Sequence, residues 1–454
     1  MKKNLYLLLI LILVQWTKIF SQSTLCYNAP NDFLADVQPN AILTEDFNAD
    51  GKFDLAISNN GSNNISILFG TGFGTFSPAI NYNVGNSPEA ICTADFNNDG
   101  QLDIASANSS SNNVSILYGM LGNFSMAYNY AVDSVPMSIC SSDFNLDGKS
   151  DLAIAIYGKN KVSVMLGSVG GFLAPISFPV DSMPIAVNSG DFNNDGIPDL
   201  VVANNRSNNV SVLLGNGLGS FSSATNFNVD VFPVSVICED FNKDSNLDLA
   251  VLNINSGIVS ILNGTGTGSF LTATNYGAGF YTSSLVSKDL NADGNKDIVV
   301  SCTLGHRIAV LLGGASGVFS APINYYVTLY PRSSCISDFN GDGKFDIAIA
   351  NSSFSVGNGN VSVLNSCILD VGIRNIEDEK WFKIYPNPTN SIIHLESNYT
   401  DLQSIKIEVA NSLCQIVLSE NYNSEINLDS LSPGVYFITL SNSSFKEILK
   451  VIKK

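Results

Sequence analysis

The chain repeats one nine-residue pattern, D-F-N-x-D-G-x-x-D or a close variant, seven times at nearly constant spacing. The copies begin at Asp46, Asp95, Asp143, Asp191, Asp240, Asp289 and Asp338, so consecutive starts lie 49, 48, 48, 49, 49 and 49 residues apart. A fixed period of this length indicates units that each pack against their neighbours. The spacing therefore predicts one large repeat domain, rather than several unrelated domains, for most of the 454 residues.

Each repeat reads as four short strands separated by polar turns. A proline seven residues before the pattern opens the first strand in six copies, and Thr282 takes its place in the sixth. The second strand, such as residues 200–203, is rich in Val, Ile and Ala and is expected to be buried on both faces. A third strand, a Gly-rich turn ending in Phe, and a fourth strand follow. Four antiparallel strands per repeat predict a blade of a β-propeller.

The two ends of the repeat array complete each other. After the seventh pattern the chain supplies a second strand at residues 345–350 and a third at residues 360–364, but no fourth. Residues 32–39 align with residues 81–88, which contain the fourth strand of the first repeat. The N-terminal segment is therefore expected to close the seventh blade, which would remove the open edges of the array. The predicted fold class is all-β, with a seven-bladed β-propeller followed by a small β-sandwich.

Every aspartate turn places oxygen ligands at alternate positions. Positions one, three, five and nine carry side-chain oxygens, position seven can add a backbone carbonyl, and Gly at position six permits a left-handed backbone. Three of the ligands are anionic and all are oxygen, which suits Ca²⁺ better than zinc or copper. We expect up to seven structural Ca²⁺ ions with Kd on the order of 10⁻⁴ to 10⁻³ M. The predicted ligands are Asp46, Asn48, Asp50, Asp54, Asp95, Asn97, Asp99, Asp103, Asp143, Asn145, Asp147, Asp151, Asp191, Asn193, Asp195, Asp199, Asp240, Asn242, Asp244, Asp248, Asp289, Asn291, Asp293, Asp297, Asp338, Asn340, Asp342 and Asp346.

Two other interpretations of these turns are an EF-hand and a purely structural turn. An EF-hand needs a carboxylate at position twelve, where this chain has Ile57, Ser106 or Ile154 inside an expected strand. The other alternative is that Asp and Asn act only as turn formers. Seven copies in one register favour metal over that alternative. The fifth turn has Ser245 in place of Gly at position six, and its site is expected to be the weakest.

The cysteines and the net charge bear on compartment and partners. Cys26 and Cys367 lie at opposite ends of the repeat array, so they are either a disulfide or two free thiols. Cys92, Cys140, Cys238 and Cys335 precede aspartate turns and are expected to be small buried residues, and Cys302 and Cys414 to be core thiols. The formal net charge of −18, without a basic stripe, makes nucleic acid an unsuitable partner.

These residues resemble the FG-GAP (VCBS-type) repeats of integrin α-subunit propellers and of secreted bacterial proteins. Phe69 and Gly70, with the stretch at residues 72–76, match the name-giving segment, and the turn that begins at Asp46 matches the calcium turn. The resemblance covers residues 26–368. It implies a seven-bladed propeller with calcium between first and second strands, but no particular activity.

The C-terminal segment is similar to the type IX (Por) secretion sorting domain of Bacteroidetes. The similarity is carried by residues 381–390, 413–417, 431–440 and 446–454, and their alternating pattern also predicts a small β-sandwich. It implies the type IX secretion machinery as a partner, and export to the extracellular space or the outer-membrane surface. Residues 1–21 read as a signal peptide, and no later segment approaches the ~20 apolar residues of a membrane span. The expected domains are the signal peptide (1–21), the propeller (22–368), a linker (369–380) and the sorting domain (381–454).

Catalysis is poorly supported, and binding is the better hypothesis. The chain has two histidines, His306 and His394, and no nucleophile-elbow or zinc-protease motif. We expect the loops opposite the aspartate turns to bind a carbohydrate, as a lectin does, or a protein ligand in adhesion. The alternative is a polysaccharide-degrading lyase or glycosidase, or a non-catalytic accessory to one. The candidate ligand-binding residues are Tyr157, Arg206, Tyr281, His306, Arg307, Tyr330 and Arg332.

Overall fold

The computed structural model describes residues 25–327, 330–352, 358–367, 382–397, 402–411, 416–442 and 446–454. The chain divides into two compact units, Met1–Leu369 and Asp370–Lys454. The expected signal peptide (1–21) and the whole expected linker (369–380) lie outside the described residues. Among the described residues, no helix is long and apolar enough to cross a membrane.

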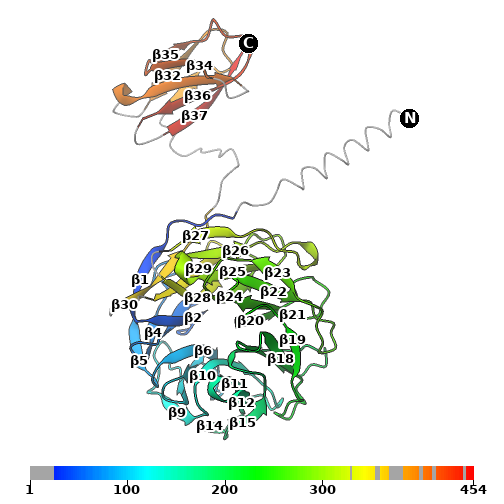
Figure 1. The fold of residues 1–454 in the computed structure, drawn as a ribbon. Coiled ribbons are helices and arrows are strands. Elements are labelled where there is room, and N and C mark those ends of the chain that lie inside the picture. Colours follow the sequence, from blue (N-terminus) through cyan, green and yellow to red (C-terminus); the bar gives the residue numbers. More distant parts are fainter. Residues whose placement is uncertain are drawn as a thin grey trace, which may run out of the picture. The chain divides into compact units, whose positions relative to one another are not determined.

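The first unit is a ring of seven four-stranded antiparallel sheets, as Figure 1 shows. The first strands are β2 (Pro39–Glu45), β6 (Pro88–Ala94), β10 (Pro136–Ser142), β16 (Pro184–Gly190), β20 (Pro233–Glu239), β24 (Thr282–Lys288) and β28 (Tyr330–Ser337). The second strands are β3 (Asp54–Asn59), β7 (Asp103–Asn108), β11 (Asp151–Ile156), β17 (Asp199–Asn204), β21 (Asp248–Asn253), β25 (Asp297–Cys302) and β29 (Asp346–Ser352). Each second strand is buried along its whole length, as its composition predicted.

The outer half of each sheet consists of a third and a fourth strand. The third strands are β4 (Asn64–Leu68), β8 (Asn113–Leu117), β12 (Lys161–Met165), β18 (Asn209–Leu213), β22 (Ile258–Leu262), β26 (Arg307–Leu311) and β30 (Asn358–Leu364). The fourth strands are β5 (Ile80–Asn83), β9 (Tyr128–Ala131), β15 (Ile176–Pro179), β19 (Thr225–Asn228), β23 (Thr274–Gly277), β27 (Ile323–Tyr326) and, in the seventh blade, β1 (Asn31–Val37). Short elements in the turns are β13 (Gly167–Ser168), β14 (Gly171–Phe172), η1 (Tyr157–Lys159), η2 (Thr303–Gly305) and η3 (Ala315–Gly317).

The N-terminal strand closes the ring, as the alignment of the two chain ends predicted. Strand β1 pairs with β30, with Asn31 opposite Val363, and completes the sheet β1-β30-β29-β28. Beside this pairing, a disulfide joins Cys26 to Cys367, whose Cα atoms lie 5.1 Å apart. The prediction of a seven-bladed propeller is therefore confirmed.

Neighbouring blades are held together by aromatic pairs that involve the aspartate turns. The Phe at position two of each turn packs edge-on against the Phe that ends the Gly-rich turn of the next blade, as Phe47 does with Phe124 at 5.6 Å. The sixth turn has Leu290 instead, and there Tyr27, close to the disulfide, belongs to the same core cluster. The other pairs are Phe96 with Phe172, Phe144 with Phe221, Phe192 with Phe270, Phe241 with Phe319, and Phe339 with Phe76.

The expectation that the cysteines before the turns are buried holds only in part. Cys335 is buried, but Cys92, Cys140 and Cys238 remain partly exposed. They lie on first strands, which form the inner edge of each sheet around the centre of the ring, where no further strand covers them (Figure 1). Cys302 is buried as expected, and Cys414 lies outside the described residues.

The second unit is a small β-sandwich, as predicted. One sheet has the order β31-β32-β35 and the other β34-β33-β36-β37, and both contribute to a single core that includes Phe382 and Ile407. Its elements are β31 (Phe382–Tyr385), β32 (Ile392–Ser397), η4 (Leu402–Ser404), β33 (Lys406–Asn411), β34 (Ile416–Asn421), β35 (Glu425–Asn427), β36 (Gly434–Ser441) and β37 (Lys446–Lys453).

Candidate metal centres and loop face

The aspartate turns link the first and second strands and are wrapped by their own side chains. In the first turn, the backbone N–H of Asp50 donates to both Asp46 Oδ1 (3.0 Å) and Asn48 Oδ1 (2.9 Å). The N–H of Gly51 donates to Asp46 Oδ2 at 2.8 Å, and that of Lys52 to Asp50 Oδ1 at 3.0 Å. Because one N–H is shared by the oxygens of positions one and three, these two oxygens converge on the inside of the turn.

The same wrapping occurs in all seven turns. The N–H of position five lies 2.8–3.1 Å from the oxygens of positions one and three in every copy. Position six has a positive φ throughout, from 81° to 84° in the six glycines and 69° at Ser245. Position four is also left-handed, for example at Leu146 and Lys243, which the sequence pattern did not predict.

The ninth residue of each turn is set apart from the other predicted ligands. Asp54 has no exposed surface, and both of its carboxylate oxygens accept backbone N–H groups. Asp54 Oδ2 accepts from Phe47 at 3.0 Å, and Oδ1 accepts from Gly70, in the Gly-Phe turn, at 2.7 Å. The ninth carboxylate thus ties the aspartate turn to the Gly-Phe turn of the same blade. The equivalent residues Asp103, Asp151, Asp199, Asp248, Asp297 and Asp346 make the same pair of bonds, with Ser366 in place of the glycine in the last blade.

Burial makes these ninth carboxylates costly to ionise. Desolvation raises the pKa of Asp54 to about 6, against the lowering effect of its two amide hydrogen bonds. The nearby carboxylates of Asp50 and Asp46 raise this pKa further. The pKa of the ninth aspartate is raised to about 6 in every blade, with burial as the main cause. A divalent cation in the turn would offset this accumulation of negative charge.

The donor set of each turn is compatible with calcium. Of the four predicted side chains, those at positions one, three and five lie within the turn, whereas the ninth is buried and bonded to two backbone N–H groups. Positions one, three and five present hard oxygen ligands in one turn, which is the ligand type that Ca²⁺ takes. Within the described ranges, no three His, Cys, Asp or Glu side chains are grouped closely enough to hold a metal by themselves. The first, third and fifth residues would therefore hold the ion, with the buried ninth carboxylate adding negative charge close by.

Replacing Ser245 with Gly is expected to stabilise the protein by about 0.5–1 kcal/mol. Ser245 has a φ of 69°, which costs a residue with a side chain about 1–2 kcal/mol, and the flexibility of Gly in the unfolded chain returns part of that gain. The measurement is the urea midpoint at unchanged m-value. Ser220→Gly, in an exposed turn without a positive φ, is the matched control and should be neutral or slightly destabilising. A loss of stability in Ser245→Gly would contradict the strain at this position.

The loops at the other ends of the strands, opposite the aspartate turns, form what we call the loop face. They connect neighbouring blades through a repeated asparagine. The side-chain oxygen of Asn63, at the end of the loop between second and third strands, accepts the N–H of Ser87 in the next blade at 2.8 Å. Asn112, Asn160 and Asn208 make the equivalent bonds to Val135, Met183 and Phe232. Gly257 and His306 occupy this position in the fifth and sixth blades, so the series of asparagine contacts stops there.

Four of the seven candidate ligand-binding residues lie together where the asparagine series stops. The N–H of Thr303 bonds the carbonyl of Tyr281, the ring of His306 lies 4.6 Å from that of Tyr330, and Arg307 begins the strand that follows His306. Arg332 follows Tyr330 on β28. Tyr157 and Arg206 lie in the loops of the third and fourth blades and do not join this group.

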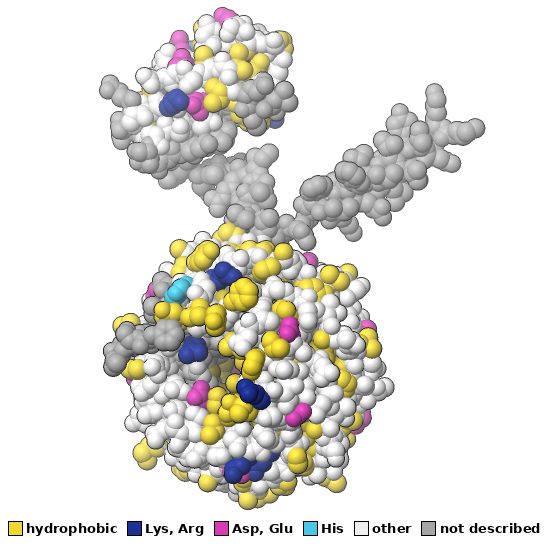
Figure 2. Space-filling model, in the orientation of Figure 1, with side chains coloured by type: hydrophobic (Ala, Val, Ile, Leu, Met, Phe, Trp, Pro, Cys, Tyr) yellow, Lys and Arg dark blue, Asp and Glu magenta, His cyan; other side chains and the backbone are white. Residues whose placement is uncertain are grey.

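Figure 2 shows the propeller face on which a histidine is visible, with apolar side chains and scattered Lys and Arg around a central hollow. His306 is the histidine of the propeller, since His394 belongs to β32 of the sandwich. Few acidic side chains appear on this face, in keeping with the position of the aspartate turns at the opposite ends of the strands (Figure 2).

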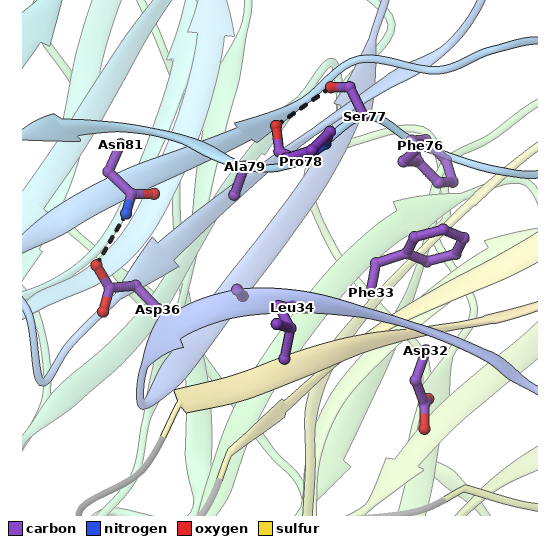
Figure 3. Close-up of a pocket in the computed structure, with 10 residues that line it drawn as sticks. Asp32, Phe33, Leu34, Asp36, Phe76, Ser77, Pro78, Ala79 and Asn81 are labelled. Atoms are coloured by element: carbon purple, nitrogen blue, oxygen red, sulfur yellow. Dashed lines mark hydrogen bonds between the residues drawn. The ribbon is translucent and has the colours of Figure 1, made fainter.

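A groove of about 490 Å³ lies at the ring-closure seam, between β1 and the segment that leads into β5 (Figure 3). Phe33 and Phe76 line it and pack edge-on at 5.3 Å. Asp36 accepts the amides of Asn81 at 3.0 Å and Asn64 at 2.8 Å, so its carboxylate is already satisfied (Figure 3). None of the predicted site residues lines this groove.

Two family models match the chain. A model described as an FG-GAP-like repeat matches residues 46–106, 143–202, 191–251, 240–300 and 289–349, which together exceed half of the chain. A model described as a secretion system C-terminal sorting domain matches residues 383–454. A search of curated proteins finds no match.

Solved propeller structures resemble the chain at low sequence identity. One is described as BBS1N in complex with ARL6DN, soaked with lead, with a TM-score of 0.54, 13% identity, and coverage of 76% of this chain and 98% of that chain. Another is the hydrazine synthase of Kuenenia stuttgartiensis, with a TM-score of 0.52, 17% identity, and coverage of 74% and 97%. At these identities the likeness concerns the fold alone.

Proposed function

The chain belongs to the FG-GAP-like repeat family and ends in a type IX secretion sorting domain, and from this premise we propose that it is an exported, calcium-stabilised binding protein. The sorting domain directs it to the cell surface or the extracellular space. In that compartment calcium is present without a dedicated delivery system. We assign the ions a structural role, because the aspartate turns are alike in every blade and cannot by themselves select one ligand.

The binding proposal rests on the part of the loop face where the series of asparagine contacts stops, at Gly257 and His306 of the fifth and sixth blades. Around it stand exposed aromatic side chains, including Phe280 and Tyr281, which are 71% and 54% exposed. Exposed aromatic rings beside Arg and amide groups are suited to sugars, which stack on rings and accept hydrogen bonds, and also to protein ligands. We place the ligand here and favour a carbohydrate, with a surface protein as the second candidate.

Replacing Tyr281 with Ala is expected to weaken binding of a carbohydrate by at least about tenfold, because an exposed ring supplies much of the contact area. The measurement is a glycan array on the exported protein at millimolar calcium, followed by titration of the sugars that bind. Phe73→Ala, which removes an 81% exposed ring on the opposite face, is the matched control.

The outcomes separate the functional classes. Absence of binding to any glycan, with capture of a surface protein that Tyr281→Ala abolishes, would favour adhesion to protein. Turnover of a polysaccharide in a substrate panel would favour the enzymatic alternative and contradict the proposal of a non-catalytic module.

A further inference from the structure

A polar pair recurs between two fixed positions of the repeat on the loop face. In the first, third and fourth blades, one member is the first residue of the third strand, and the other lies ten residues before the aspartate turn, ahead of the first strand of the same blade. In the first blade, Asn64 Nδ2 donates to Asp36 Oδ2 at 2.8 Å. In the fourth blade, Asn209 Nδ2 donates to Asp181 Oδ2 at 2.8 Å. A donor at the strand start is thus matched by a carboxylate from the loop.

The third blade has a cation at the strand position, and it too is matched. Lys161 begins β12, and its Nζ lies 2.7 Å from Asp133 Oδ2. The ammonium group holds the pKa of Asp133 below its usual range. In the third blade, the positive charge at the start of the third strand is therefore neutralised by the loop aspartate.

The sixth blade keeps the cation but lacks the carboxylate. Arg307 begins β26, and the loop position holds Gly279, so that a side chain added there would meet the guanidinium. Among the described residues, no carboxylate forms an ion pair with an arginine. The Nε of Arg307 is buried without a hydrogen-bond acceptor, and its other described polar contact is the thiol of Cys302.

A half-buried guanidinium without an anionic partner is unfavourable, because desolvation of the charge is not offset. Among the described residues around it, the segments 278–283, 302–307, 325–327 and 330–332 contain no Asp or Glu that could compensate the charge. Arg307 therefore lacks the loop carboxylate that neutralises the cation of the third blade, and a carboxylate of a ligand would take that role.

We propose that the sixth blade binds an acidic glycan, with Arg307 pairing the carboxylate of a uronic acid residue in the place that Asp133 fills for Lys161. Aromatic rings frame this position. Phe280 and Tyr281 follow Gly279 directly, and Tyr326, 69% exposed, lies opposite Arg307 in the register of β26 and β27. Rings next to an arginine fit a sugar that carries a carboxylate better than an acidic peptide, because the ring faces offer a stacking surface for the sugar.

The test is calorimetric titration of the exported protein with a short oligogalacturonate at millimolar calcium. A short oligomer avoids the gels that calcium forms with long polyuronates. The same oligomer with methyl-esterified carboxyls, and an oligoglutamate of similar charge, are the matched ligands. Arg307→Gln is expected to weaken oligogalacturonate binding about 10- to 100-fold. Lys161→Gln, at the equivalent position of the third blade, should bind as the unaltered protein does.

Binding of oligogalacturonate that is lost on esterification and in Arg307→Gln supports the proposal, provided that a thermal melt shows the variant to be folded. Equal binding of the methyl ester, equal or tighter binding of oligoglutamate, unchanged affinity in Arg307→Gln, or no binding at all would overturn it. The proposal rests on the binding function above, and the two fail separately. Array binding of neutral sugars that depends on Tyr281 but not on Arg307 would leave the binding function standing and remove the acidic ligand.

Discussion

Chelation of calcium is expected to lower the melting temperature of the exported protein by roughly 10–15 °C. At 10 mM calcium, a site with Kd near 10⁻³ M stabilises the folded state by about 1.4 kcal/mol, so seven occupied sites contribute about 10 kcal/mol. The measurement is a thermal melt in 10 mM calcium and again in excess EDTA. Magnesium in place of calcium should restore little, because it demands a smaller, more regular coordination shell. A melt that EDTA does not change would remove calcium from the account of this fold.

The pH dependence of the same melts provides an internal control. Burial raises the pKa of the ninth aspartates from 3.8 to about 6, so the metal-free fold binds protons more tightly than the unfolded chain. This contribution to stability is present in full below pH ~4 and is lost as the pH rises through about 6. In EDTA, the protein should therefore melt higher at pH 5 than at pH 8. In calcium the order should reverse, because protons compete with the ion for the carboxylates.

Replacing Phe144 with Ala is expected to destabilise the protein by about 3–5 kcal/mol, the largest effect that we expect from one side chain. Phe144 has no exposed surface and packs edge-on against Phe221 of the next blade, with ring centres 5.5 Å apart. Its loss would open a cavity between two blades, next to the buried Asp151 that accepts the N–H of Phe144. Chemical denaturation at fixed calcium concentration measures the change.

Two variants control for this effect. Phe144→Leu should cost less than about 1.5 kcal/mol, because the sixth turn already carries Leu290 at the same position, 8% exposed. Phe73→Ala, at a ring that is 81% exposed, should change stability by less than about 0.5 kcal/mol. If Phe144→Ala cost no more than Phe73→Ala, the aromatic pairs would not be what joins the blades.

Periodic features of this chain were predictable from the sequence. The spacing of the aspartate turns sets the number of blades, and the alignment of residues 32–39 with residues 81–88 foresaw that β1 would complete the last sheet. The left-handed backbone at position six followed from Gly in six copies, and Ser245 keeps it without a glycine. Each of these features depends on local chemistry that is repeated, so a prediction made for one copy applies to the others.

Features that depend on contacts between distant residues were not predictable. The sequence placed Asp54 among the calcium ligands on equal terms, because spacing does not show that Phe47 and Gly70 both donate to its carboxylate. From the sequence, Arg307 was a candidate ligand-binding residue only because it is an arginine in a loop opposite the aspartate turns. The lack of an anionic partner for Arg307 is apparent only from the structure, in which Lys161 and Asp133 pair at the equivalent positions of the third blade. The assignment of the calcium ligands and of the ligand-binding residues stays a prediction.

The bond between Cys26 and Cys367 has a mechanical consequence. These residues are 341 positions apart in the sequence, yet their Cα atoms are separated by 5.1 Å. A pull applied between the two ends of the chain therefore passes from one terminal segment to the other through a single covalent link, and all seven blades lie outside the line of force. A protein held at a surface by its C-terminal segment could thus be dragged by flow or by a moving neighbour at either end without its sheets being stretched.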